Sequence, residues 1–349
     1  MAYAAISKPS LHFNTNLHTG TGSTQQITTG LNMSANGGMV WNKSRSASNN
    51  HIMWDTIRTA TKSIYPDLNA AEATEATSLT AFTTTGWTGG GTGNTNANGT
   101  TFVSWNWLAG SSHSGSSNND GSITSTVSAN TTAGFSIVKY TGADAVRTVG
   151  HGLGVKPNMI IIKRLDSTGN WEVYHSSLGA TKYVHLNANG SAGTSAARWN
   201  DTEPTSSVFT LSTSANVNAN GNYIAYCFAE KKGYSKFGSY TGNGNADGPF
   251  IYTGFKPAFV IFKVTNDNDN WHMHDDKRTT NGGNPLNKVL YPNLNNSEGS
   301  VDIDFLSNGF KPRSNNNAFN ASGKPYIYMA FAAEPLVANV GNSIPATAR

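Results

Sequence analysis

The chain has 349 residues, of which only 13% are charged, and its formal net charge is +4 at pH 7. The length allows two or three domains. The small positive excess contains no run of Lys or Arg, which excludes the charge pattern of a nucleic-acid-binding surface, and no apolar stretch is long enough to span a membrane. The single cysteine, Cys227, excludes an intrachain disulfide.

The first part of the chain predicts one β-module. A short strand begins at Phe13, an apolar strand ends at Lys43, and a strand over 102–107 places large apolar side chains at every second position. Such alternation puts one face of a strand in a core. The segment 55–63 is the best helix candidate, because an acidic residue at its start can cap the first turn.

The rest of the chain repeats this pattern twice. Trp171 and the strand before it return a hundred residues later at Trp271, and both copies carry a continuous apolar strand that ends in lysine. A segment rich in Ser, Asn and Gly separates the first copy from the second and predicts a linker. The predicted organisation is module 1 over 1–110, a linker over 111–133, module 2 over 134–230, module 3 over 231–334 and an extended C-terminal arm over 335–349.

A fixed period predicts an array of small units that share a continuous core. We therefore expect an all-β fold of three tandem β-sandwich-like modules of about 100 residues, with short helical turns. Trp171 and Trp271 occupy the same phase of the repeat and are predicted to be core residues. The pairs Asp55/Arg58 and Asp275/Arg278 also recur, and we expect each to form a structural cap or ion pair after an aromatic strand.

Residues that could carry chemistry do not recur in this way. The counterparts of Cys227 are Asn106 and Ala330, so a packed side chain is the better interpretation. His272 and His274 could begin a metal site, but module 1 has Ile and Trp at these positions. We predict no metal site and no cofactor.

Acidic residues in module 3 give weaker indications of function. Asp302 and Asp304 lie on one face of a predicted strand, as paired carboxylates of a glycoside hydrolase could, but no such pair recurs. The segment 267–270 resembles a calcium loop without its glycine and its distant glutamate. A depolymerase is the least favoured function, and we predict that the protein is not an enzyme.

Loop residues are the better candidates for a binding surface. Aromatic rings stack on sugar faces, and amides and carboxylates hydrogen-bond sugar hydroxyls. On this basis the predicted surface-binding residues are Trp87, Trp199, Asp267 and Asp269.

Several phrases of the sequence resemble a known family. They are the segments 134–142, 149–157 and 240–250, with the Trp-Asp-Thr-Ile-Arg run at 54–58 and the His-Asp-Asp-Lys-Arg run at 274–278. Over residues 11–332 the chain resembles a repeated module of marine bacteriophage virion proteins, described as tail-fibre or structural proteins. The resemblance implies a virion component that is assembled in the host cytoplasm, and it implies no catalytic residue.

Two functions remain open. The first is a tail-fibre or receptor-binding protein for host adhesion, whose partners are a host-surface glycan or an outer-membrane receptor. The second is a capsid decoration or cement protein, or a tail adaptor, with a purely structural role. Both functions involve other virion proteins and self-association, with a homotrimer favoured. Neither involves nucleic acid or membrane insertion.

Overall fold

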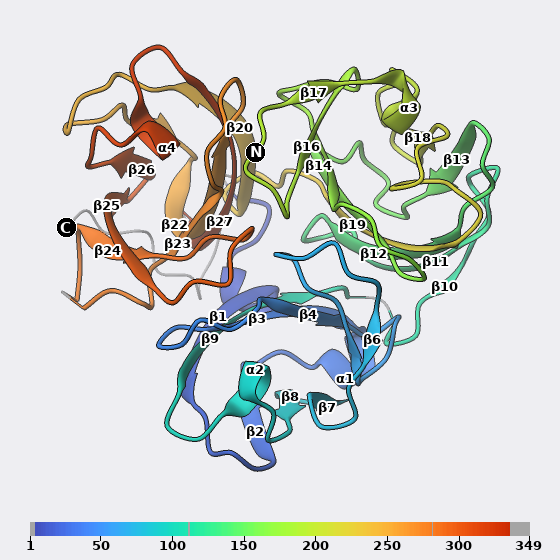
Figure 1. Ribbon diagram of the computed structural model, residues 1–349, viewed down its shortest axis with the longest axis horizontal. Coiled ribbons are helices and arrows are strands. Elements are labelled where there is room, and N and C mark those ends of the chain that lie inside the picture. Colours follow the sequence, from blue (N-terminus) through green and yellow to red (C-terminus); the bar gives the residue numbers. More distant parts are fainter. Residues whose placement is uncertain (1–3, 111, 281, 336–349) are drawn as a thin grey trace.

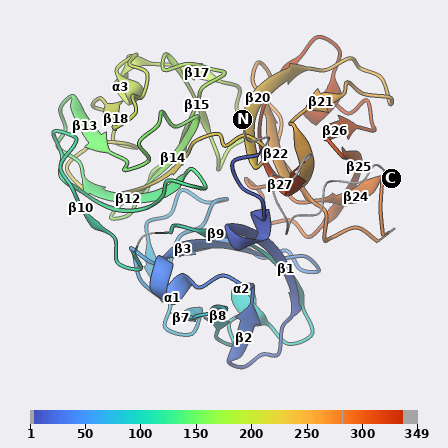
Figure 2. The same cartoon turned by 180° about the vertical axis from the view of Figure 1, so that it is seen from behind.

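The computed structural model describes residues 4–110, 112–280 and 282–335. Strands make up 43% of the chain and helices 6%, so the predicted all-β fold is confirmed. Three groups of sheets surround a common centre, with module 1 in blue, module 2 in green and module 3 in orange to red (Figure 1). The view from behind shows the same three-part ring (Figure 2). In the described part of the chain, no helix has both the length and the apolarity to cross a membrane.

The inner sheet of each module contains four strands in the same order, and in module 2 these four are the middle of an eight-stranded sheet. The strand that closes the module lies second in this order and is hydrogen-bonded on both sides, which explains its continuous burial. The inner strands, in sheet order, are β1 (Phe13–Thr19), β9 (Thr101–Leu108), β3 (Gly38–Ser44) and β4 (Ile52–Asp55) in module 1; β12 (Phe135–Thr141), β19 (Asn222–Phe228), β14 (Met159–Arg164) and β15 (Glu172–His175) in module 2; and β20 (Ser235–Thr241), β27 (Pro325–Pro335), β22 (Phe255–Val264) and β23 (His272–Asp275) in module 3.

A smaller outer sheet covers the other face of each inner sheet, as in a β-sandwich. Its strands, in sheet order, are β2 (Gln25–Thr28), β8 (Gly86–Gly89) and β7 (Leu79–Phe82) in module 1; β13 (Arg147–Gly150) and β18 (Val208–Leu211) in module 2; and β21 (Ile251–Tyr252), β26 (Gly309–Pro312), β25 (Gly299–Leu306) and β24 (Leu286–Val289) in module 3. A separate hydrophobic core lies between the two sheets of each module.

Short elements complete the fold. Strands β16 (Lys182–His185) and β17 (Gly193–Thr194) extend one edge of the module 2 inner sheet, and β5 (Lys62–Ser63) pairs with β6 (Ala73–Thr74). The helices are η1 (Pro9–Leu11), α1 (Met33–Asn36), α2 (Gly93–Asn96), α3 (Ala196–Trp199) and α4 (Asn317–Asn320).

The inward faces of the three inner sheets meet in one central core. Trp107, Phe228 and Phe331 occupy the same position in the three closing strands, and their ring centroids lie 5.6 to 6.2 Å apart in all three pairs. These residues therefore form a triangle at the centre of the ring. Burying three large aromatic rings against one another stabilises the contact between modules as well as each module.

The ring closes through the same backbone hydrogen bond at each of its three junctions. In every case an amide that follows the aromatic strand of one module donates to a carbonyl at the end of the apolar strand of the next, over 2.8 Å. The pairs are Glu72 N to Leu165 O, Ala192 N to Thr265 O and Glu298 N to Arg45 O. Module 1 thus contacts module 2, module 2 contacts module 3, and module 3 returns to module 1.

Two sequence predictions are wrong. The expected linker 111–133 contains β10 (Ser116–Asn118) and β11 (Ser125–Asn130), which add two strands to the edge of the module 2 inner sheet at β12. Val127 and Ser128 of β11 are buried, so the segment packs although its composition is polar.

The expected helix at 55–63 is a series of turns, since Thr59 and Thr61 have φ values of 75° and 70°, which an α-helix excludes. Of the predicted C-terminal arm, Pro335 ends β27, and residues 336–349 lie outside the described residues.

Candidate functional site

The recurring Asp and Arg residues form buried ion pairs. Arg58 Nε lies 2.5 Å from Asp55 Oδ2, and Arg278 Nε lies 2.6 Å from Asp275 Oδ2, with no more than 1% of any of the four side chains exposed. Each aspartate also accepts the backbone N–H of its arginine, over 2.9 and 3.0 Å. The two pairs therefore act both as caps and as ion pairs.

Each of these aspartates also binds the closing strand of a neighbouring module. Tyr226 OH donates to Asp55 Oδ2 over 2.7 Å, and Trp105 Nε1 donates to Asp275 Oδ2 over 3.0 Å. At the third junction, His175 Nε2 lies 3.1 Å from the carbonyl oxygen of Tyr328. The Asp–Arg pairs thus sit at the junctions of the ring, where burial limits their access to a substrate.

Arg58 shows how these junctions hold a charge. Burial opposes the charged guanidinium, but Asp55, Tyr226 and Glu72 together raise the pKa of Arg58 above its ordinary value. Burial also raises the pKa of Tyr226, so its hydroxyl stays protonated and can donate to the carboxylate.

We expect Tyr226→Phe to lower the free energy of unfolding by about 1.5–3 kcal/mol, because it removes a buried hydrogen bond to the carboxylate of the Asp55–Arg58 ion pair. Urea denaturation followed by tryptophan fluorescence measures this change. The control is Tyr234→Phe, at a buried tyrosine whose hydroxyl makes no hydrogen bond to a described residue. Equal losses in the two variants would contradict a role for the Tyr226 hydroxyl at the junction.

Lysines at the ends of the apolar strands also join modules. Lys43 Nζ donates to Asn295 O and Lys163 Nζ donates to Asn69 O, each over 3.3 Å and each into another module. Lys263 Nζ donates to Val264 O over 2.8 Å within its own module. Burial lowers the pKa of all three to about 8. Their backbone partners and their recurrence indicate a structural role.

The prediction of Trp87 and Trp199 as surface residues is wrong. They are 0% and 2% exposed. Trp87 packs on Trp54 at a centroid distance of 5.9 Å, and Trp199 Nε1 donates to Lys182 O over 3.1 Å. Both side chains fill the core between two sheets, which the Gly-rich and polar residues around them concealed. Trp171 and Trp271, predicted to be core residues, are buried, so that prediction is confirmed.

The predicted acidic residues lie on the hairpin between β22 and β23. Asp267 is exposed and forms an ion pair with Lys324 at 3.1 Å, and its hydrogen bond to that lysine lowers the pKa of the carboxyl. Asp269 is half-buried and accepts the N–H of Asn270 over 2.8 Å, while its own N–H donates to Asn189 O of module 2. The structure therefore places Asp269 at a junction between modules.

The other reactive side chains considered from the sequence are buried. His272 and His274 stack on Phe262 with centroids 5.6 and 5.7 Å away. In the described residues, no group of three His, Cys, Asp or Glu side chains is placed to hold a metal ion. Cys227 is fully buried, and burial raises the pKa of its thiol.

Sequence reasoning missed a polar cluster in module 2. Glu172 is fully buried, and its Oε1 lies 2.7 Å from Asn216 Nδ2, 3.1 Å from His185 Nε2 and 3.4 Å from Arg198 Nε. The guanidinium of Arg198 in turn lies 4.0 Å from the centroid of the Tyr183 ring. The sequence signal for this polar cluster was Glu172, which stands at the strand position that Ile52 occupies in module 1.

A second missed feature is an exposed aromatic pair in module 3. Phe250 and Tyr252 are 47% and 58% exposed, and they are the only aromatic side chains of the described residues that are exposed. They flank the buried Ile251 on edge strand β21, so they point to the outer face of the outer sheet. The Phe250 ring lies against Gly309 of β26, because a Cβ atom added to this glycine would be only 2.8 Å from the ring.

Charged residues continue this outer face beside the aromatic pair. Lys311 of β26 is the antiparallel partner of Asp304 of β25. Ile251 is the partner of Phe310, so Phe250 lies opposite Lys311. Phe250, Lys311 and Asp304 therefore lie in one row across the sheet. Next to them is a cavity of about 640 Å³ whose polar lining residues are Asn245, Asp247, Asn284, Asp302, Asp304 and Arg313. We call Phe250, Tyr252, Lys311 and the polar residues of this cavity the module 3 outer face.

The charges of this face are largely paired. Asp247 accepts from Lys311 over 2.8 Å and from Arg313, and Arg313 Nε lies 3.4 Å from Asp304. Within the described residues, the Asp302 carboxylate has no hydrogen bond or ion pair and remains available. Burial raises the pKa of Asp304, although Arg313 and Lys311 oppose the shift.

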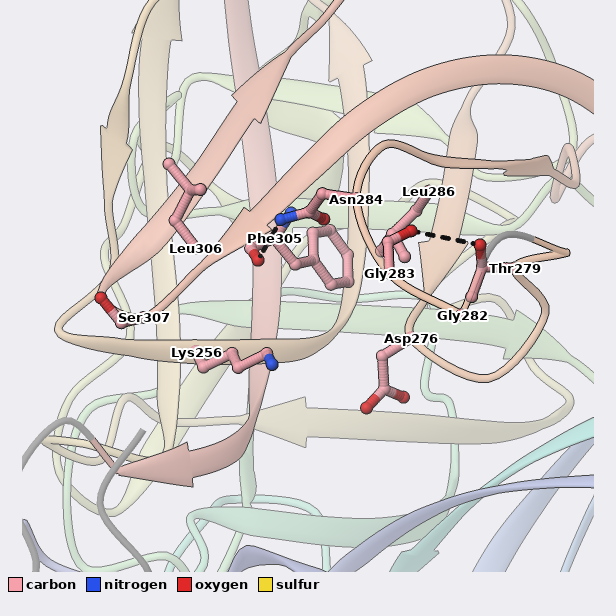
Figure 3. Close-up of a pocket in the computed structure, with 10 residues that line it drawn as sticks. All are labelled: Lys256, Asp276, Thr279, Gly282, Gly283, Asn284, Leu286, Phe305, Leu306 and Ser307. Atoms are coloured by element: carbon pink, nitrogen blue, oxygen red, sulfur yellow. Dashed lines mark hydrogen bonds between the residues drawn. The ribbon is translucent and has the colours of Figure 1, made fainter. Parts of the chain in front are cut away.

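A further cavity of about 450 Å³ is also lined by Asn284 (Figure 3). The Asn284 side chain holds β25 by two hydrogen bonds of 2.9 Å with the backbone of Phe305. Figure 3 shows Lys256 and Asp276 on the side of the cavity opposite Asn284. Burial raises the pKa of Asp276 to about 6. Asn284 therefore lines both this cavity and the cavity of the module 3 outer face.

A family model matches residues 8–335 of the chain, and its description is a domain of unknown function, DUF7483. No protein with a curated description matches the sequence. The match covers all three modules of the ring and includes both strands of the segment that was expected to be a linker. The chain therefore belongs to the DUF7483 family.

Proposed function

We propose that this protein is a component of a bacteriophage virion that binds the host surface, as a tail-fibre or receptor-binding protein. The observation that carries the proposal is the module 3 outer face, where two exposed aromatic rings adjoin a polar cavity. Specific binding in an array of similar modules should lie where the copies differ. Among the described residues of the other two modules, no aromatic side chain is exposed as Phe250 and Tyr252 are.

The ring suits a binding protein physically. Its modules share one central core and repeat the same hydrogen bond at each junction, so the outer loops are held on a rigid scaffold. In this proposal the protein acts by binding and not by catalysis, and it requires no cofactor. The sequence resemblance to phage virion proteins supports the particle as its location.

A second candidate is a capsid decoration or cement protein, or a tail adaptor. The approximate threefold arrangement of the modules favours it, because a pseudo-threefold ring can sit on a threefold position of a shell or tail (Figure 1). In this role the three modules would make similar contacts with other virion proteins.

Electron microscopy of intact virions labelled with an antibody against the protein separates the two candidates. We expect label at the tail tip only, and we expect the purified protein to compete with phage adsorption to host cells. Label over the whole shell would favour decoration. No label on particles, together with no effect on adsorption, would reject both candidates.

We also propose that the protein assembles as a homotrimer on the particle. Because each chain closes its own ring, such a trimer has to form through outward surfaces and not through the junctions described above. Light scattering of the purified protein should give three times the chain mass of 37.0 kDa. A monodisperse monomer at all concentrations would contradict the trimer.

A further inference from the structure

We propose that the module 3 outer face binds a neutral saccharide, with Phe250 and Tyr252 as its stacking platform and the adjoining polar cavity as its hydrogen-bonding site. This inference rests on the proposed host-binding function and adds the chemical class of the ligand. Three properties of the face lead to it: its difference from the other modules, its paired charges, and its free carboxylate.

The comparison between modules isolates the aromatic pair. Ile27, Val149 and Ile251 are equivalent, because each is paired with a buried aromatic residue of the neighbouring strand in the outer sheet. The residues on either side of them in the sequence are Gln26 and Thr28 in module 1, Thr148 and Gly150 in module 2, and Phe250 and Tyr252 in module 3. The core position is kept while its neighbours change, so packing of the module does not require the two rings.

Exposed aromatic rings beside a polar cavity fit a sugar. The C–H face of a pyranose packs on an aromatic ring, while its hydroxyls donate to carboxylates and accept from amides and guanidinium groups. The module 3 outer face offers both kinds of contact, since Lys311 and Asp304 continue the row that begins at Phe250. The cavity volume of about 640 Å³ accommodates one or two sugar units.

The charge pattern favours a neutral sugar over an anionic one. Both cations of the face already bind carboxylates, at 2.8 Å for Lys311 with Asp247 and 3.4 Å for Arg313 with Asp304. An anionic ligand would have to displace these partners and would face the unpaired Asp302. A neutral polyol can hydrogen-bond to Asp302 without breaking either ion pair.

The test is an array of neutral hexopyranose oligosaccharides and of uronate-containing and sialylated glycans, followed by calorimetric titration with the strongest oligosaccharide. We expect binding to neutral glycans. In the variant Phe250→Gln/Tyr252→Thr, which carries the module 1 residues, affinity should fall about tenfold or more. Asp302→Asn should weaken binding, because it replaces one accepting oxygen with a donor.

Matched controls make a negative result informative. Val146→Ala removes an exposed side chain of module 2 that is 47% exposed, the same fraction as Phe250, and should leave binding unchanged. The melting temperature of every variant should stay at the wild-type value, since each replaced side chain is exposed or half-buried. Binding only to anionic glycans, binding unaffected by the double variant, or no binding to any glycan would each overturn the inference.

The failure of this inference can be told apart from the failure of the proposed function. If the double variant still competes fully with phage adsorption, the proposed host-binding function stands and the proposed saccharide site is wrong. Tail label with binding that depends on the aromatic pair would support both.

Discussion

Replacing Asp55 by Ala should lower the free energy of unfolding by about 3–5 kcal/mol, because the change leaves the Arg58 guanidinium buried without its closest counter-ion. Arg58 is almost fully buried, and its Nε lies 2.5 Å from Asp55 Oδ2. The same carboxylate accepts the hydroxyl of Tyr226 from module 2, so its loss also removes a contact across the junction. Urea denaturation of the whole chain measures the effect.

A surface pair of the same chemistry provides the control. Arg164 Nε lies 2.8 Å from Asp166, and the aspartate side chain is 37% exposed. Asp166→Ala should cost less than about 1 kcal/mol, since solvent screens an exposed ion pair. The double variant Asp55→Ala/Arg58→Met should recover part of the loss, because it leaves no unpaired buried charge. Equal effects of Asp55→Ala and Asp166→Ala would show that burial at the junction does not determine the cost.

The sequence predicted the parts of the fold that follow from periodicity. The alternation in the closing strands placed one face of each strand in a core, and in the structure Trp107, Phe228 and Phe331 of these faces pack together. Periodicity could not show that they meet at one centre. A repeat indicates which side chains face inward within a module, but the angle between modules depends on contacts such as that between Tyr226 and Asp55, which are 171 residues apart.

The wrong predictions were those based on the local amino-acid composition and not on the repeat pattern. Trp87 and Trp199 were predicted to be exposed because polar and glycine residues surround them, yet a large aromatic ring is buried wherever a second layer can cover it. The segment 111–133 was predicted to be a linker for the same reason, although the backbone of a polar strand can still complete a sheet edge.

The candidate site was the hardest part to predict. Phe250 and Tyr252 follow a Pro and flank an isoleucine, a pattern that also describes an ordinary core strand. Only the structure, in which the Ile251 side chain between them is buried, shows that the two rings face solvent. The aligned repeats nevertheless contained the signal, because polar or small residues stand at both positions in the other two modules.

Stability should fall steeply on acidification from neutral pH, and the cause is a set of buried histidines. Burial lowers the pKa of His175 and His272 from 6.5 to about 4, and that of His51 and His274 well below 6.5. The unfolded chain binds protons at these sites first, so the stability present above pH 6.5 is lost as the pH falls towards 4. For His175 and His272, a shift from 6.5 to about 4 corresponds to about 3 kcal/mol for each histidine.

Four carboxyls act in the opposite direction, because burial raises the pKa of Asp304 and Glu334 as well as that of Asp67 and Asp276. Burial raises the pKa of Asp67 and Asp276 to about 6, so protonation of these groups between pH 6 and 4 favours the folded state. The four buried histidines outweigh these carboxyls, and we expect the free energy of unfolding to fall by at least about 3 kcal/mol between pH 7 and pH 4.5. The measurement is urea denaturation at three or four pH values across this range.

The variant His274→Phe identifies the source of the pH dependence. The His274 ring stacks on Phe262 with centroids 5.7 Å apart, so phenylalanine can occupy the same place in the core without titrating. We expect the variant to fold at pH 7 and to show a smaller loss of stability at pH 4.5 than the wild type, because one proton-binding group of the unfolded chain is gone. If the stability of the wild type stays constant or rises from pH 7 to 4.5, the carboxyls dominate the pH dependence. If the variant loses as much stability over this range as the wild type, His274 does not contribute to the pH dependence.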